Sequence, residues 1–191
     1  MANTIDLNGY AINKELLSAG VITPGHLLVR DASGTVVVHA TAGGRAEPIF
    51  AREDDLQGND LTVDYASGDR IQMLVFPPGG EVNALVAASA PAITVGDFLE
   101  SAGDGTLRVP VDVADLTGTL TGTVDGALID ITFNATWSQA QADEINKNFK
   151  EFQTIVNAFL PEVGQFPVAV ALESVDNSGG GSAVRIRAEI L

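Results

Sequence analysis

The stretch from Val21 to Val38, VITPGHLLVRDASGTVVV, returns in outline as AITVGDFLESAGDGTLRV, which runs from Ala92 to Val109. Between Ile22 and Val38 the two copies share seven identical residues in 17 aligned positions. Each copy contains a glycine-bearing turn, a short strand-like run, a second tight glycine turn and another strand-like run. The repeat therefore predicts two similar β-hairpins in one small body. Neither copy contains a motif that indicates chemistry.

Short β-like segments recur along most of the rest of the chain. They are rich in aliphatic and β-branched residues and are bounded by turns rich in Gly, Pro, Asn and Asp. The expected strands outside the hairpins lie at 46–52, 70–76, 81–87, 167–175 and 183–191. Residues 116–130, LTGTLTGTVDGALID, predict thin strands with glycine bends. The pattern is therefore that of a mainly β protein.

One segment, about 138–160, predicts a long α-helix with Ser138 as its N-cap and Pro161 after its end. Its apolar residues alternate in steps of three and four, which makes a narrow seam. The seam consists of Ile145, Phe149, Phe152, Val156 and Phe159. It can pack on the β body of its own chain or join copies of the chain around an axis. A membrane-surface helix is disfavoured because its polar face carries only two lysines.

These patterns divide the chain into three parts. Residues 1–20 form an N-terminal arm, and residues 21–112 and 167–191 form the β body. Residues 113–166 form an insertion that contains the 116–130 stretch and the helix. For the arm, two structures remain open: an extended segment that pairs with a partner, or a strand in its own sheet.

The charge of the chain excludes several classes of partner. The formal net charge is -15 and the sequence pI is about 4.2. Because phosphate backbones are bound by clustered Lys and Arg, nucleic-acid binding is not expected, and an anionic membrane surface would repel this chain. The chain has no cysteine, and it shows neither a signal peptide nor an apolar run long enough to span a membrane. We therefore expect a soluble protein made in the cytoplasm.

No constellation in the sequence points to catalysis. His26 and His39 lie on facing strands of one predicted hairpin, and solvent-facing positions are expected for both. The acidic triplet 53–55 lacks the spacing of a calcium loop and predicts a solvated loop. No serine-hydrolase elbow and no phosphate-binding glycine loop occurs. The sequence therefore predicts no catalytic residue, no metal site and no cofactor, and the protein is not expected to be an enzyme.

Several segments resemble the capsid decoration, or cement, proteins of tailed bacteriophages. They occur in the same order and the resemblance extends over more than half of the chain. The matching segments are residues 20–28 (GVITPGHLL), 50–55 (FAREDD) with Gly58, 65–69 (YASGD), 95–99 (VGDFL) with 103–105 (GDG), and 171–177 (ALESVDN) with 185–187 (RIR). The 113–166 insertion departs from the smallest members of that family.

This resemblance implies a small β-barrel or β-tulip-like body, built here from the two similar hairpins, with the inserted helix beside it. It also implies a structural virion protein on the outer surface of the phage head. Such proteins bind the major capsid protein at capsomer junctions, often as trimers, and stabilise the expanded capsid. Self-association, as a trimer or a dimer, is expected for the same reason.

The N-terminal arm is then the candidate contact with the capsid, by adding a strand to an exposed sheet edge. Its candidate contact residues are Ile5, Leu7, Tyr10 and Ile12. The alternative function is a β-clip-like module that binds a carbohydrate or another small ligand, with Trp137 as the aromatic side chain available for stacking on a sugar.

Overall fold

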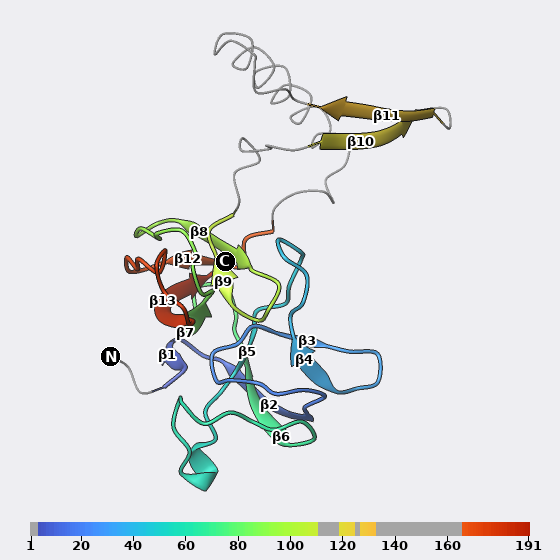
Figure 1. The fold of residues 1–191 in the computed structure, drawn as a ribbon. Coiled ribbons are helices and arrows are strands. Elements are labelled where there is room, and N and C mark those ends of the chain that lie inside the picture. Colours follow the sequence, from blue (N-terminus) through green and yellow to red (C-terminus); the bar gives the residue numbers. More distant parts are fainter. Residues whose placement is uncertain (1–3, 111–118, 125–126, 133–165) are drawn as a thin grey trace. The chain divides into compact units, whose positions relative to one another are not determined.

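The computed structural model describes residues 4–110, 119–124, 127–132 and 166–191. The chain forms two compact units, one of residues 1–110 and 165–191 and one of residues 111–164. β-Strands dominate both described parts (Figure 1), and among the described residues the only helical element is the 3-10 turn η1, Asp55–Gln57. The predicted α-helix over 138–160, its seam from Ile145 to Phe159, and Trp137 lie outside the described residues.

The strands are short and follow one another through tight turns. Most of them are three to six residues long, and β5 and β12 are shorter than the strands predicted at 46–52 and 167–175. Their bounds are β1 Asp6–Asn8, β2 Ile12–Leu17, β3 Leu28–Arg30, β4 Val36–Val38, β5 Ile49–Ala51, β6 Arg70–Val75, β7 Glu81–Val86, β8 Phe98–Ser101, β9 Leu107–Arg108, β10 Thr119–Val124, β11 Ala127–Thr132, β12 Ala169–Ala171 and β13 Val184–Ile190.

In the unit of residues 111–164, β10 and β11 form an antiparallel hairpin. The register pairs Thr119 with Thr132 and Val124 with Ala127, so two residues, Asp125 and Gly126, connect the strands. The prediction of thin strands in the 116–130 stretch is therefore confirmed for the described part of it.

Five strands of the other unit close into a barrel, here called the C-terminal barrel. The sheet order is β7-β13-β12-β8-β9, and a parallel pairing of Val86 with Leu107 joins β9 back to β7. Closure removes the free edges that an open sheet of this size would have. β1 adds to the outside of β7. Buried in or against this barrel are Val82, Ala84, Val86, Ile93, Leu99, Leu107, Ala169, Ala171, Ile186, Ala188 and Ile190.

Strands β2 to β6 form a second ring in the same unit, here called the N-terminal barrel. β2, β6 and β5 make one sheet and β3 pairs with β4. Single bridges connect the two pieces, an antiparallel one between Leu27 and Phe50 and a parallel one between Ser18 and Val36. The resulting order is β2-β6-β5-β3-β4 and back to β2. Its core holds Ile22, Leu28, Val36, Ile49, Ala51, Tyr65, Ile71 and Met73.

The two barrels have the same topology, so the repeat is longer than the two hairpins that the sequence predicts. Strands β2 to β6 match β7, β8, β9, β12 and β13 in turn. The matching hydrogen bonds include Gly25 N to Ala51 O (2.8 Å) with Gly96 N to Ala171 O (2.9 Å), and Ala19 N to Val36 O (3.0 Å) with Ala87 N to Leu107 O (3.0 Å). The described unit is therefore a tandem pair of barrels, with residues 111–164 between β9 and β12 of the second one.

The N-terminal segment belongs to this unit. β1 pairs with β7, and β2 pairs with β6 from Ile12 to Leu17. Of the two structures left open for residues 1–20, the strand in its own sheet is therefore the one that forms. The prediction of an arm available to add a strand elsewhere is wrong for β1, because the sheet edge of β7 already binds it.

Gly25 and Gly96 provide a matched test of how closely the barrels approach. Both have positive φ, +94° and +93°, but a Cβ on Gly25 would lie 2.6 Å from Arg185 Nη1, whereas one on Gly96 would meet nothing within 4 Å. We expect Gly96→Ala to cost about 1 kcal/mol of unfolding free energy from backbone strain alone. Gly25→Ala should cost about 2 to 4 kcal/mol, because the guanidinium must also move.

Chemical denaturation of both variants at low protein concentration measures the difference. Equal losses would show that the Gly25 turn does not pack against Arg185.

Candidate functional site

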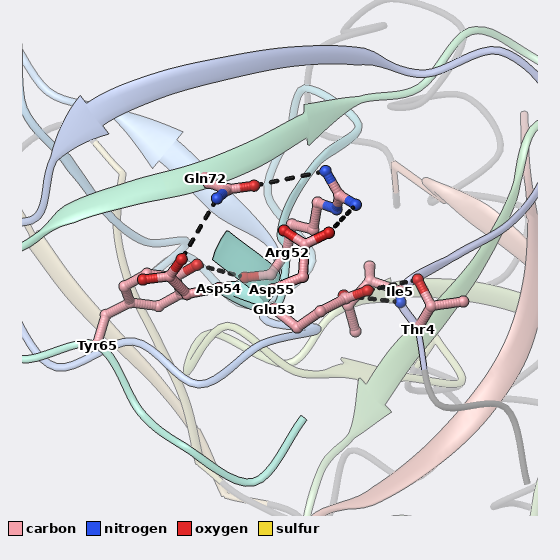
Figure 2. A network of polar contacts seen from close by, with 8 residues as sticks. All are labelled: Thr4, Ile5, Arg52, Glu53, Asp54, Asp55, Tyr65 and Gln72. Carbon is pink, nitrogen blue, oxygen red and sulfur yellow. Dashed lines mark hydrogen bonds and ion pairs between the residues drawn. The ribbon is translucent and has the colours of Figure 1, made fainter. Parts of the chain in front are cut away.

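The acidic triplet after β5 holds the N-terminal strand in place. Glu53 is buried, and its two carboxylate oxygens accept hydrogen bonds from Thr4 Oγ1 (2.5 Å) and from the Ile5 backbone amide (3.1 Å), as Figure 2 shows. The prediction of a solvated loop is therefore wrong for Glu53, although Asp55 is exposed. A carboxylate with two donors at short range is a strong local anchor. Glu53 thus fixes the start of β1 beside the barrels.

The rest of the triplet forms a polar network with β6. Arg52 donates from Nη1 to Gln72 Oε1 (3.4 Å) and from Nη2 to Asp55 Oδ2 (2.8 Å), and Gln72 Nε2 donates to Asp54 Oδ1 (3.4 Å). The Tyr65 hydroxyl donates to the Arg52 carbonyl (2.8 Å), and Figure 2 shows these side chains around one loop. Burial raises the pKa of Tyr65 to about 12, so the hydroxyl remains a donor at any physiological pH.

Glu53 and Tyr65 bind backbone groups and the other side chains bind one another, so the network positions the loop and the start of β1. We therefore expect Glu53→Ala to cost about 2 to 4 kcal/mol of unfolding free energy, since it leaves the Thr4 hydroxyl and the Ile5 amide without their acceptor. Amide hydrogen exchange should accelerate over residues 5–8.

Asp55→Asn is the matched control, because Asp55 makes a half-exposed ion pair with Arg52 and should cost less than about 1 kcal/mol. If the two variants lose similar stability and exchange over 5–8 stays slow, Glu53 is not the anchor of β1.

The four candidate contact residues have different surroundings. Ile5 is fully buried in the hydrophobic core and cannot contact a partner, so its assignment as a contact residue is wrong. Glu53 and the β7 edge bury it, which the sequence of the N-terminal segment alone does not reveal. Leu7 is half-buried. Tyr10 is 81% exposed and Ile12 is 51% exposed, so these two remain available at the entry to β2.

The two histidines do not face solvent as predicted. His39 is buried, with Nδ1 2.8 Å from Ser101 Oγ and Nε2 3.1 Å from the Arg45 carbonyl. In the tautomer in which Nε2 donates a hydrogen bond to the Arg45 carbonyl, Nδ1 accepts a hydrogen bond from the Ser101 hydroxyl. This serine–histidine contact joins the two barrels, and both side chains are buried. Among the described residues, no group of three or more His, Asp or Glu side chains could hold a metal ion.

His26 closes the first turn of the repeat. Its Nδ1 accepts the Thr23 amide (3.1 Å), as Asp97 Oδ2 accepts the Thr94 amide in the second copy (2.8 Å). Burial lowers the pKa of His26 from 6.5, while Asp104 and Asp64 oppose that shift. A protonated His26 would lose the acceptor on Nδ1. The neutral ring is therefore part of the folded turn.

The lowered pKa of His26 predicts that the stability of the fold decreases as the pH falls. A histidine whose folded-state pKa lies below its unfolded value stabilises the fold above about pH 6.5 and loses that contribution as the pH falls. Denaturation between about pH 7.5 and 5.5 should show a fall in stability that is smaller in His26→Asn, whose Oδ1 keeps an acceptor without titrating. Identical pH slopes would exclude His26 as the source.

The contact between the barrels contains residues that the sequence pattern did not single out. Arg185 on β13 donates to the carbonyls of Pro24 (2.9 Å) and Leu61 (2.7 Å), and burial lowers its pKa. The Leu85 amide donates to the Gly25 carbonyl (3.2 Å), and the Leu27 amide donates to the Gly105 carbonyl (2.7 Å). The sequence signal that could have identified these residues is the repeat itself. Leu85 and Arg185 have counterparts of the same type in the first barrel, Leu17 and Arg70.

Comparisons with known proteins find similarity among solved structures. No family model and no curated protein sequence matches this chain. Among solved structures, the chain is similar to one described as the head fiber gp8.5 N base in bacteriophage phi29, with 12% sequence identity, 95% of each chain covered and a TM-score of 0.46. A likeness at this level assigns neither a fold nor a function to the chain. No described helix is both long and apolar enough to cross a bilayer.

Proposed function

We propose that this protein is a structural component of a tailed-phage virion that binds the major capsid protein on the outer surface of the head. There it lies at capsomer junctions and stabilises the expanded shell, with no catalysis and no cofactor. This proposal rests on where the segments that resemble the decoration proteins lie in the structure. The 50–55 and 65–69 segments build the Glu53 network, and the 20–28 segment builds the turn at the barrel contact. The segments that carry the resemblance are thus among those that hold the two barrels together.

The candidate capsid contact is the entry to β2. Tyr10 and Ile12 are large, exposed side chains that follow strand β1, which pairs with β7. Tyrosine and aliphatic side chains of this kind commonly anchor protein interfaces because they bury much area at little entropic cost. The anchor residues are held by a rigid support, since Glu53 and β7 fix β1 only a few residues away.

Charge and mass action favour an external position. A chain with a net charge of -15 is repelled by packaged nucleic acid, which would oppose a position inside the head. A protein that binds only the expanded shell stabilises that state in proportion to its occupancy. If each oligomer touches several capsid subunits, individually weak contacts reinforce one another.

Co-sedimentation with emptied, expanded heads of the phage that encodes this chain tests the proposed function. The wild-type protein should bind in stoichiometric amounts. Replacing Tyr10 and Ile12 together by Ser should weaken binding by about tenfold or more, because two interface anchors are lost. Both side chains are exposed, so the fold should remain intact.

Leu56→Ser is the matched control, because Leu56 is as exposed as Tyr10 but lies on η1. Its binding should equal that of the wild type. A wild-type protein that does not sediment with heads would overturn the proposed function, whereas full binding by the double variant would overturn only the assignment of the contact.

A further inference from the structure

Within the chain, the two barrels meet through two complementary surfaces. The N-terminal barrel contributes its first turn, with Pro24, Gly25 and Leu27. The C-terminal barrel contributes the β7 edge and β13, where Leu85 and Arg185 are directly opposite each other in the register. All of these residues except the half-buried Arg185 are buried, and Leu27 is fully so.

The repeat assigns each of these residues a counterpart on the other barrel. The hairpin alignment matches the first-turn residues with Val95, Gly96 and Phe98. The strand matching places Leu17 and Arg70 where Leu85 and Arg185 lie, and these two are also directly opposite each other. Each barrel therefore carries both surfaces, but within the described part of the chain only one of each is in contact with the other barrel.

The unused surfaces are exposed and apolar. Phe98 is 55% exposed and Val95 is 64% exposed, whereas their counterparts Leu27 and Pro24 are buried. Leu17 is 46% exposed, whereas Leu85 is buried. These differences arise although the backbone of the two barrels is closely matched, so they reflect a missing neighbour.

The backbone of β2 also lacks hydrogen-bond partners that the matching strand β7 has. In the C-terminal barrel the amides of Asn83, Leu85 and Ala87 donate to Ile5, Gly25 and Leu107. Their counterparts are Glu15, Leu17 and Ala19, and of these only the Ala19 amide has an acceptor, Val36 O, among the described residues. The Ser18 amide donates to Asp69 on the β6 side, so the amides of alternate residues Glu15 and Leu17 point away from β6. They form an open strand edge.

Arg70 completes the match. Its counterpart Arg185 donates to the Pro24 carbonyl across the contact, 2.9 Å away. The Arg70 guanidinium is exposed and makes no hydrogen bond or ion pair with any described residue. A leucine and an arginine thus stand side by side in both barrels, once in a formed interface and once on the surface.

We propose that a second copy of this chain fills the open surface by repeating the intramolecular contact between copies. The first turn of the C-terminal barrel, with Val95, Gly96 and Phe98, packs on Leu17 and Arg70 of the next copy. The Leu17 amide then donates to the Gly96 carbonyl, and Arg70 donates to the Val95 carbonyl. The contact is head to tail, and such contacts close into a ring where the rotation between copies allows it.

A second copy is the occupant that the observations favour, because both halves of a known interface are present and unused on one chain. The contact is also compatible with a net charge of -15 on each copy. Its central groups are apolar side chains and a cation that faces carbonyl oxygens, so it brings few like charges together. This inference concerns the purified protein and does not depend on binding to phage heads.

Light scattering and sedimentation of the purified full chain over a wide concentration range test it. The wild type should be oligomeric, and Leu17→Glu and Phe98→Glu should each reduce the mass, with a rise in the dissociation constant of about tenfold or more. Leu56→Glu is the control and should keep the wild-type mass. Arg70→Met, which keeps the side-chain stem, should weaken association with less risk to folding.

Mixing Leu17→Glu with Phe98→Glu tests whether the contact between copies is head to tail. Leu17→Glu retains an intact Phe98 surface and Phe98→Glu retains an intact Leu17 surface, so an equimolar mixture should form heterodimers that neither variant forms alone. Circular dichroism and thermal unfolding verify that each variant is folded.

A monomeric wild type at every concentration would overturn the proposal, as would folded variants, Arg70→Met included, with the wild-type mass. Failure of the mixture to pair would exclude the head-to-tail contact.

Discussion

Arg185 reaches from β13 into the contact between the two barrels, where its guanidinium donates to the carbonyls of Pro24 and Leu61. A half-buried guanidinium that loses part of its water needs protein acceptors, so the position of this side chain favours a Gly25 turn and a Leu61 loop that stay close together. This turn requires glycine at position 25, because a Cβ there would collide with Arg185 Nη1. One cation thus couples three segments that lie far apart in the sequence.

The same requirement explains why the N-terminal strand is fixed. The Asn83 amide beside this contact donates to the Ile5 carbonyl, and Glu53 accepts the Ile5 amide from the other side. The Glu53 charge also raises the pKa of Arg185, which partly offsets the effect of burial on that group. The polar groups around the barrel contact therefore offset the desolvation of one another. Removing one of them leaves a buried partner without its hydrogen bond and destabilises the contact.

The sequence predicts the local part of this structure well and the non-local part poorly. The glycine turns and alternating runs identify the hairpins and most strands, because those signals depend on nearby residues. The full repeat was missed because the flanking strands are short and share few identities, among them Leu17 with Leu85 and Arg70 with Arg185. The burial of Ile5, Glu53 and His39 could not be predicted, since each is covered by a segment distant in the chain.

Tandem repeats that stack through one kind of contact leave two unmatched faces at the ends of the array. Repeat proteins that stay monomeric cover those faces with atypical, polar terminal repeats. Here the described residues cover neither end in that way: one presents Leu17 and Arg70 beside an open strand edge, and the other presents Val95 and Phe98. Exposed apolar positions of this kind are a liability for a protein that must remain in solution alone. In the head-to-tail contact proposed above, the next copy of the chain would cover both faces, and this is the arrangement in which their exposed apolar residues cease to be a liability.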